Sequence, residues 1–447
     1  MNTKSAHYLR PLILSALAIF AVYALYSGVR MAGSHRPSDI YGIKSLWPSD
    51  QIIDDSWMAM RQGYWYITTP HDKPIYSTLF IEKQVKFQYP LSSLFVMYAT
   101  TDSTVLNSIS LASIPVTCLF MVLIFNTFLT TASGKSFKEA TGGEKAIRIA
   151  LPVIMTLSFQ PLMFAYRLGQ IQPWLTMGFV IATWLFMRGA LTPSGAMLGL
   201  LTLVKPQFAI FLIWGALRKK WSFCASFFAV ALVGTLLSLA VFGLKDNLDY
   251  LNVLKLLSQR GEQYVANQSV NGLVTRFLHG SVNDWKGYFL PPFSPVVYAA
   301  TLISTLLFIG GAMFVPARFR GGIADFMLAG FTSAIASPVA WTHHYGVLLP
   351  VFAALFAWTT RERPLGRWTL PLTCTSFFLI GLDLGWFWGL GPTKLNFIQA
   401  YPFFGVLIAL GILYVWVLRG EPGGEESISI VKEDAVSHTP VVQGSLA

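Results

Sequence analysis

Residues 196–217 read AMLGLLTLVKPQFAIFLIWGAL, a strongly apolar stretch with Lys205 and Pro206 at its centre. Proline lacks the backbone N–H that a helix needs, so it interrupts the helical hydrogen-bond ladder. A lysine at the centre of a bilayer costs ~2.5–3.5 kcal/mol on insertion scales. Arg188 and the cluster beginning at Arg218 both resemble cytoplasmic flanks, so the stretch should start and finish on one side. We therefore predict two half-helices with Lys205 at their apex, facing a polar cavity.

The apolar character extends over most of the chain. Hydrophobic residues make up 54% of the 447 residues, charged residues make up 12%, and the mean hydropathy is +0.55. Because a soluble domain has roughly 25% charged residues, we predict an all-α polytopic membrane protein. The length allows about ten to twelve transmembrane helices of ~20 residues each.

The net charge of +11 does not indicate a nucleic-acid partner. The basic residues lie in short clusters at the ends of apolar segments, such as Arg218-Lys219-Lys220. This is the pattern of cytoplasmic loops in membrane proteins, and it differs from a basic stripe that follows phosphates. The cysteines, which lie inside apolar stretches without metal-ligand spacing, are interpreted as packing residues: Cys118, Cys224 and Cys374.

The apolar segments divide the chain into helices and two long loops. We predict a retained first helix at about 12–31 with a cytoplasmic N-terminus. Segments at about 33–90 and 244–292 are predicted to be extracytoplasmic loops. We expect residues 1–418 to form one membrane domain and residues 419–447 to form a disordered cytoplasmic tail. Further spans are predicted up to about 129 and at 147–165, 171–187, 222–243, 293–315, 322–339, 345–359, 368–389 and 397–418.

Several polar side chains fall on the external side of this predicted domain. The run Ser337–Tyr345, SPVAWTHHY, places His343 and His344 where an apolar segment ends. Ionisable groups at membrane depth are costly, so they usually line a polar cavity. A carboxylate with histidines and lysine suits chemistry on a phosphorylated substrate, because the carboxylate can accept a proton while the cations hold phosphate. The other polar residues are Asp54, Asp55, Gln170, Lys205, Gln268 and Arg276.

Each of these features also has a structural alternative. One aspartate of the Asp54-Asp55 pair can cap a following helix. Lys205 can extend its charged end to the membrane surface, and the two histidines can belong to an interfacial aromatic belt. Asn267-Gln268-Ser269 is a complete N-glycosylation sequon, and Arg276 can be an ordinary external charge.

Five motifs follow the first helix and its acidic site in a fixed order. They are Phe87-Gln88-Tyr89-Pro90, Gly169-Gln170, Lys205-Pro206, Asn267-Gln268-Ser269 with Arg276, and Ser337-Pro338 through His343-His344. In this order they resemble the YPP, GQ, KP, NQS-to-Arg and SPxSWxHH elements of the family 87 glycosyltransferases. These are membrane enzymes of the GT-C class and include the mycobacterial phosphatidylinositol-mannoside mannosyltransferases. The resemblance covers about residues 10–415.

The resemblance implies a GT-C type bundle and an inverting glycosyl transfer on the extracytoplasmic side. The expected donor is a polyprenyl-phosphate hexose, with mannose as the sugar, and the expected acceptor is a lipid or glycan. Asp55 or Asp54 is then the catalytic base, and His343 and His344 act on the leaving phosphate, with His343 expected to matter slightly more. No metal or other cofactor is expected, since the histidines lack the i, i+4 spacing of a zinc pair. The substrate-binding residues implied are Lys205, Gln170, Gln268 and Arg276.

The chain also departs from the family pattern. Leu91 and Ala340 stand where proline and serine are usual. The register of the acidic motif stays open, because the aromatic spacing after Asp55 does not match that of the family, and Asp39 is a third candidate. Asp55 is favoured by its distance to Ile75-Tyr76.

A second class of protein is consistent with part of the pattern. A broken helix and intramembrane charge are typical of a transporter or lipid flippase. The lack of an internal repeat and the two long external loops favour an enzyme, and a polymer ligase would differ by using a donor longer than one sugar. The chain has no GxxxxGK[ST] phosphate loop, so nucleotide cleavage is not supported. The expected location is the bacterial inner membrane, with the active site facing outward.

Overall fold

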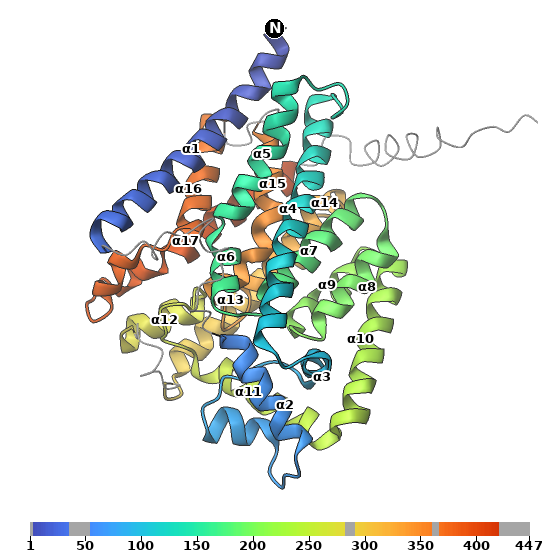
Figure 1. The fold of residues 1–447 in the computed structure, drawn as a ribbon, viewed down its shortest axis with the longest axis vertical. Coiled ribbons are helices and arrows are strands. Elements are labelled where there is room, and N and C mark those ends of the chain that lie inside the picture. Colours follow the sequence, from blue (N-terminus) through green and yellow to red (C-terminus); the bar gives the residue numbers. More distant parts are fainter. Residues whose placement is uncertain (1–2, 35–53, 282–290, 360–365, 420–447) are drawn as a thin grey trace, which may run out of the picture.

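The computed structural model describes residues 3–34, 54–281, 291–359 and 366–419. Over these ranges the chain forms helices joined by loops and contains no β-strand (Figure 1), as predicted for an all-α protein. The α-helices are α1 (Thr3–Ser34), α2 (Asp55–Thr68), α3 (Phe95–Ala99), α4 (Ser103–Ser133), α5 (Gly142–Ser158), α6 (Gln160–Arg167), α7 (Gln172–Met187), α8 (Leu191–Thr202), α9 (Ile210–Leu217), α10 (Trp221–Phe242), α11 (Leu244–Arg260), α12 (Val270–His279), α13 (Pro295–Met313), α14 (Ile323–Ile335), α15 (Leu349–Trp358), α16 (Thr369–Gly381) and α17 (Tyr401–Arg419).

Short helical turns of 3₁₀ or π type connect several of these helices. The π turn is η3 (Ser77–Glu82), and the 3₁₀ turns are η4 (Leu91–Leu94), η5 (Pro206–Ala209), η7 (Ala317–Phe319), η8 (Thr342–Leu348), η9 (Gly366–Trp368), η10 (Gly385–Leu390) and η11 (Asn396–Ala400).

The apolar helices confirm a polytopic membrane protein. Within the described ranges, five helices are long and apolar enough to cross a membrane, namely α1, α4, α10, α13 and α17. Helices α5 and α6 add a sixth span if they are counted together, with a 50° bend between them. Pro161 lies in the first turn of α6, where its missing N–H does no harm, and a new helix starts there instead of continuing α5. The total of ten to twelve helices stays a prediction.

Three predicted spans form shorter helices than a membrane crossing requires. Helices α14 and α16 have 13 residues each and α15 has 10, whereas a span needs ~20. Every residue of α15 and every residue of α14 except Ile323 is buried. A helix that is apolar all round belongs inside a bundle, so α14 and α15 form its centre rather than its lipid-facing surface.

The break at Lys205-Pro206 is present as predicted. Helix α8 ends at Thr202, η5 begins at Pro206, and Lys205 between them has extended backbone angles. The half-helix α8 packs closely against α10, because Gly195 and Gly199 leave no side chain between them. A Cβ atom would lie 2.2 Å from the carbonyl oxygen of Phe223 at Gly195, and 2.5 Å from that of Phe227 at Gly199. Small residues four apart commonly permit such close helix packing in membranes.

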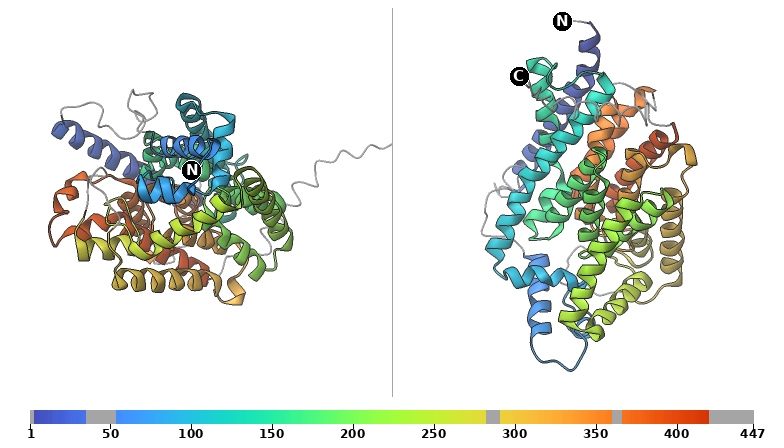
Figure 2. Two further views of the ribbon diagram at one scale, coloured as in Figure 1. Left: turned by 90° about the horizontal axis from the view of Figure 1, so that it is seen from below. Right: turned by 90° about the vertical axis from the view of Figure 1, so that its right-hand side faces the viewer.

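The described parts of both predicted external loops contain helices and lie at one end of the molecule. Helix α2 and the π turn η3 belong to the first predicted loop, and α11 and α12 belong to the second, which is therefore not an open loop. In Figures 1 and 2 this end is opposite the N-terminus. The third candidate aspartate, Asp39, and residues 420–447 of the predicted tail lie outside the described residues.

Candidate active site

The start of α2 is fixed against the turn that follows α6. The backbone N–H of Asp55 donates to the carbonyl oxygen of Leu168 at 2.7 Å, and that of Ser56 donates to Gly169 at 3.1 Å. A helix start leaves several N–H groups without partners in the helix, and these two find acceptors on a neighbouring segment. This docking brings the acidic motif of the first loop to the Gly169-Gln170 motif.

Gln170 connects Asp55 to Tyr89 through hydrogen bonds. The amide nitrogen of Gln170 donates to a carboxylate oxygen of Asp55. The amide oxygen of Gln170 accepts from the hydroxyls of Ser56 and of Tyr89, the latter at 3.1 Å. Three predicted motifs, separate in sequence, thus meet through direct contacts.

The surroundings of Asp55 suit a general base. The side chain is half-buried. Burial raises the pKa of its carboxyl above the ordinary value, while the Gln170 hydrogen bond and the charge of Lys86 act in the opposite direction. A carboxylate with a raised pKa accepts a proton more readily near neutral pH.

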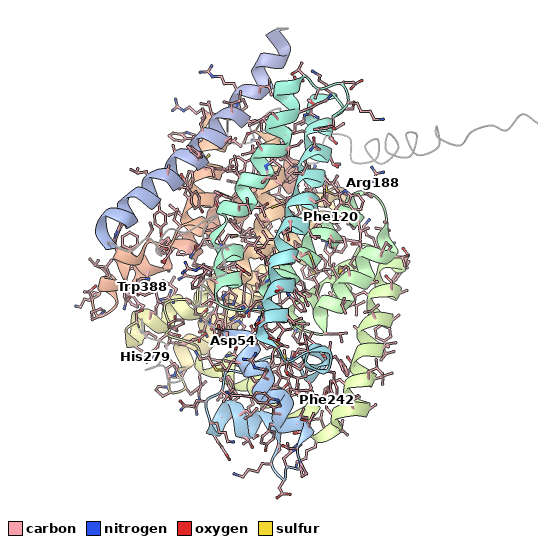
Figure 3. The ribbon with its side chains drawn as sticks, viewed as in Figure 1. Asp54, Phe120, Arg188, Phe242, His279 and Trp388 are labelled. Carbon is pink, nitrogen blue, oxygen red and sulfur yellow. The ribbon has the colours of Figure 1, made fainter. Side chains whose placement is uncertain are left out.

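Asp54 has a different role in the structure. It adopts a left-handed backbone conformation with φ of 59°, which aspartate tolerates better than most residues. Its carboxylate pairs with Arg61 of α2 and accepts from the hydroxyl of Ser103 at 3.1 Å. Figure 3 shows Asp54 where α2 meets the bundle. These contacts tie α2 to the start of α4, so the geometry favours Asp55 over Asp54 as the reactive carboxylate.

Lys205 lies inside the protein and has a polar partner there. Its side chain is buried, and the ammonium donates to the amide oxygen of Gln172 at 2.8 Å. Gln172 is the first residue of α7, two positions after Gln170. The alternative that Lys205 extends to the membrane surface does not fit this burial.

The two histidines of η8 have different surroundings. His343 is buried, whereas His344 is half-buried and lines a cavity together with Lys205. Each has a buried ring nitrogen, Nε2 of His343 and Nδ1 of His344, with no hydrogen-bond partner among the described residues. Of the two histidines, His344 is therefore the one that a ligand in the cavity would contact, while the expectation that His343 matters slightly more stays a prediction.

Gln268 and Arg276 support the histidine-bearing segment and do not line the cavity. Gln268 donates from its amide nitrogen to the carbonyl of Val265 at 2.7 Å, and Arg276 donates to that of Asn267 at 2.6 Å. The side-chain oxygen of Asn267 in turn accepts from the backbone N–H of Ala340 at 3.0 Å. These contacts hold the segment before the histidines in place. Because Asn267 is fully buried, the glycosylation sequon is inaccessible in the folded chain.

The cavity has a volume of about 330 Å³ and combines a cationic part with an apolar part. Its polar and charged lining includes Lys86, Lys205 and His344. Its apolar lining comes from the broken helix and from α11 and α13: Val204, Ile210, Leu254, Leu257 and Ile309. Such a lining suits an amphiphilic ligand with an anionic group and a hydrocarbon chain.

Tyr89 separates Asp55 from this cavity. Its side chain lines the cavity and also contacts Gln170, the hydrogen-bond partner of Asp55. Asp55 is not part of the cavity lining. The carboxylate of Asp55 is therefore connected to the cavity wall through Gln170 and Tyr89.

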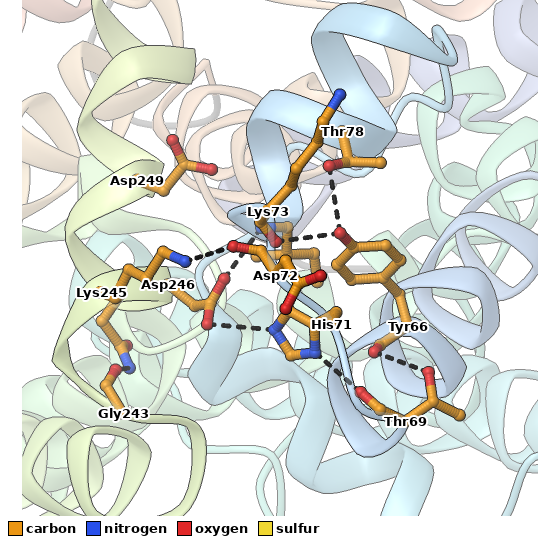
Figure 4. Close-up of polar contacts among 12 residues, drawn as sticks. Tyr66, Thr69, His71, Asp72, Lys73, Thr78, Gly243, Lys245, Asp246 and Asp249 are labelled. Carbon is orange, nitrogen blue, oxygen red and sulfur yellow. Dashed lines mark hydrogen bonds and ion pairs between the residues drawn. The ribbon is translucent and has the colours of Figure 1, made fainter.

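Polar contacts also fix the loop after α2 onto α11, which contributes to the cavity (Figure 4). His71 lies 3.3 Å from a carboxylate oxygen of Asp246, and the other oxygen accepts from the backbone N–H of Ile75 at 2.8 Å. Lys245 donates to the carbonyl of Asp72 at 2.6 Å. These contacts join the two external loop regions to each other.

Four residues near the site were not identified from the sequence: Lys86, Gln172, Glu262 and Ser56. Lys86 directly precedes the motif Phe87-Gln88-Tyr89-Pro90, and Gln172 completes a Gln-Ile-Gln run, so both had a local signal. Glu262 had none, because its contact with Lys86 depends on how the second external loop folds.

No cluster of metal-binding side chains is present in the part of the chain that the structure describes. Nowhere in these ranges do three His, Cys, Asp or Glu side chains gather in a way that could hold a metal ion. The independence from metals stays a prediction.

The fold and this site define a membrane-embedded enzyme-like bundle, with a carboxylate, cationic groups and an amphiphilic cavity near one end. The sequence model of glycosyltransferase family 87 matches residues 87–338, which is more than half of the chain. The protein therefore belongs to glycosyltransferase family 87 and acts on a sugar donor and an acceptor. No curated protein matches the chain at a significant level.

Proposed function

We propose that this glycosyltransferase uses a polyprenyl-phosphate hexose as donor and acts on the extracytoplasmic side of the bacterial inner membrane. The acceptor is a hydroxyl of a lipid or glycan. Mannose is the proposed sugar, and this choice rests on the motif resemblance alone. The main support for the donor class is the cavity, in which Lys205 and His344 adjoin an apolar wall.

The proposed reaction is a single displacement with inversion. Asp55 accepts the proton of the acceptor hydroxyl, whose oxygen attacks the anomeric carbon from the face opposite the phosphate. The bond between that carbon and the phosphate oxygen breaks, and its electron pair remains on the phosphate. General-base assistance of this kind contributes ~10²–10⁴-fold to the rate.

Lys205 and His344 are proposed to stabilise the leaving phosphate. The donor phosphate carries one negative charge as a diester and about two after the glycosidic bond has broken. Hydrogen-bond donors that are already in place stabilise this increase without having to reorganise. Gln170 orients Asp55, while Gln268 and Arg276 support the site from behind the segment that contains the histidines.

A donor panel tests the proposal. Membranes containing the protein are incubated with radiolabelled polyprenyl-phosphate mannose, glucose or arabinose, or with a nucleotide-linked mannose, and the products are identified by mass. We expect a glycoside from polyprenyl-phosphate mannose, and about 10²–10⁴-fold slower formation when Asp55→Asn replaces the wild type. Transfer only from the nucleotide sugar would contradict the donor class. Movement of the lipid-linked sugar across liposomes without glycoside formation would favour a flippase.

A further inference from the structure

Lys86 is held at the cavity wall by an acidic and an aromatic partner. Its ammonium nitrogen lies 3.5 Å from an oxygen of Glu262, with side-chain exposures of 12% for Lys86 and 1% for Glu262. The same nitrogen lies 5.5 Å from the centre of the Trp341 ring and 5.6 Å from that of Tyr264. Aromatic faces attract cations at such distances, and more strongly when water is excluded.

Glu262 is itself fixed by its surroundings. It follows Gly261, whose φ of 75° suits glycine, and a Cβ atom there would lie 2.6 Å from the side-chain oxygen of Asn271. The backbone N–H of Glu262 donates to that same oxygen at 3.0 Å. One carboxylate oxygen accepts from the indole N–H of Trp341 at 2.7 Å, and the other faces Lys86.

Two structural features indicate that this pair serves a ligand rather than stability alone. Burying an ion pair costs desolvation that the attraction within the pair repays poorly, so such a pair is weak evidence for a purely stabilising role. Lys86 also lines the same cavity as Lys205 and His344. An ammonium group has three N–H donors, so it can contact a carboxylate and a second anion at once.

We propose that Lys86 binds the phosphate group of the donor and that Glu262 positions Lys86 for this contact. This inference rests on the proposed polyprenyl-phosphate donor. Lys86 lines the cavity with Lys205 and His344, and it is close enough to Asp55 for their charges to interact. It therefore acts where negative charge increases as the glycosidic bond breaks, beside the groups already assigned to Lys205 and His344.

Four substitutions separate the roles of the two residues, with Lys83→Met as a control. Lys83 is exposed and lies three positions before Lys86, outside the cavity lining. Lys86→Met should lower kcat and kcat/KM together by about 10²-fold, the range for loss of one group that stabilises a developing anion. Lys86→Arg should retain part of the activity, and Lys83→Met should retain all of it. Equal activity of Lys86→Met and Lys83→Met would overturn the proposal.

The test for Glu262 includes the pH profile. Burial lowers the pKa of Lys86, and Glu262 and Asp55 raise it. The other titratable groups that line this cavity are Lys205, His344, Tyr89 and Tyr250. Lys86 is active only when protonated, and loss of the Glu262 charge lowers the pKa of Lys86. Glu262→Gln should therefore shift the alkaline loss of activity to lower pH, and Glu262→Asp should largely restore the wild-type profile. Equal losses in both variants with an unchanged profile would reduce Glu262 to a structural partner of Trp341.

Binding of farnesyl phosphate to the purified full-length protein gives a readout that does not require turnover. We expect Lys86→Met to weaken this binding about 10-fold, a change of ~1.4 kcal/mol, and Lys83→Met to leave it unchanged. Inorganic phosphate should compete poorly, because it lacks the apolar part. If the wild type transfers no polyprenyl-linked sugar, the proposed function is wrong. If Lys86→Met binds farnesyl phosphate as tightly as the wild type does, the inference about Lys86 is wrong. Equal competition by inorganic phosphate would overturn the lipid phosphate as the ligand.

Discussion

Asp54 and Asp55 are neighbours in sequence but differ in what their carboxylates contact. Asp55 contacts Gln170, and Asp54 contacts Arg61 and Ser103. We expect Asp55→Asn to lower kcat by about 10²–10⁴-fold, because an amide cannot accept the proton. Asp54→Asn should keep near-normal activity, since asparagine tolerates the left-handed backbone. Steady-state kinetics at equal amounts of folded protein provide the measurement.

The stability of the two variants provides the control for this comparison. The pair of Asp54 with Arg61 is partly exposed, so its loss should cost at most about 1 kcal/mol. Thermal unfolding in detergent should therefore show only a small decrease in Tm for Asp54→Asn. An inactive but well-folded Asp54→Asn beside an active Asp55→Asn would exchange the roles of the two residues.

Gln170 should control the pH at which Asp55 becomes active. Its hydrogen bond lowers the pKa of Asp55 against the opposing effect of burial, so Gln170→Ala should raise that pKa further. The base works only when deprotonated, and a higher pKa therefore moves the acidic loss of activity to higher pH. The profile of kcat/KM against pH measures this shift. Gln172→Ala removes the partner of Lys205 instead and should leave the acidic limb in place.

The histidine pair offers a matched comparison within two residues. His344 lines the cavity, and His343 is buried next to it. We expect His344→Ala to lower kcat and kcat/KM by about 10²-fold with little change in the donor KM, because its contact develops in the transition state. His343→Ala should lower activity less. A larger effect of His343→Ala would restore the order predicted from the sequence.

At the scale of helices, the broken segment between α8 and α9 determines where Lys205 lies. Pro206→Ala restores a backbone N–H and lets the helix continue, which should move the ammonium away from Gln172. A displacement of about 1 Å can cost ~10²-fold, so activity should fall although the charge is kept. Pro193→Ala, in the first turn of α8, should have little effect. Transfer assays on both variants measure the difference.

A double substitution shows whether Pro206 acts through Lys205. If it does, Pro206→Ala combined with Lys205→Met should be no worse than Lys205→Met alone, because coupled residues do not add. Lys205→Met keeps the apolar stem, so membrane insertion should be preserved. Fully additive losses would show that Pro206 supports the packing of the bundle independently of the position of Lys205.

The parts of this architecture that follow from local rules could be predicted from the sequence. The break at Lys205-Pro206 follows from the backbone chemistry of proline. The long apolar helices follow from apolar stretches of sequence that are long enough to cross a membrane. The contact of Lys86 with Glu262 could not be predicted, because no spacing rule relates a residue of the first loop to one of the second. The short central helices α14 and α15 were predicted to be longer, since burial on all sides gives the same apolar pattern as a lipid-facing span.

At the scale of the whole molecule, the charges at the two ends predict its orientation in the membrane. The turn between α4 and α5 contains exposed Lys138 and lies at the end opposite the loop with exposed Asp72 (Figure 1). Short loops rich in lysine and arginine remain in the cytoplasm. We therefore expect the end that contains α2 and the candidate site to face outward.

Cysteine labelling of intact bacterial cells tests this orientation. In a chain whose Cys118, Cys224 and Cys374 have been replaced by alanine, Asp72→Cys should react with a membrane-impermeant maleimide added outside. Lys138→Cys should react only after the cells are permeabilised. Retained glycosyl transfer by both variants is the control, because it shows that the labelled protein is folded. The reverse labelling pattern would place the cavity and Asp55 at the cytoplasmic face, and the donor would then have to be presented from inside the cell.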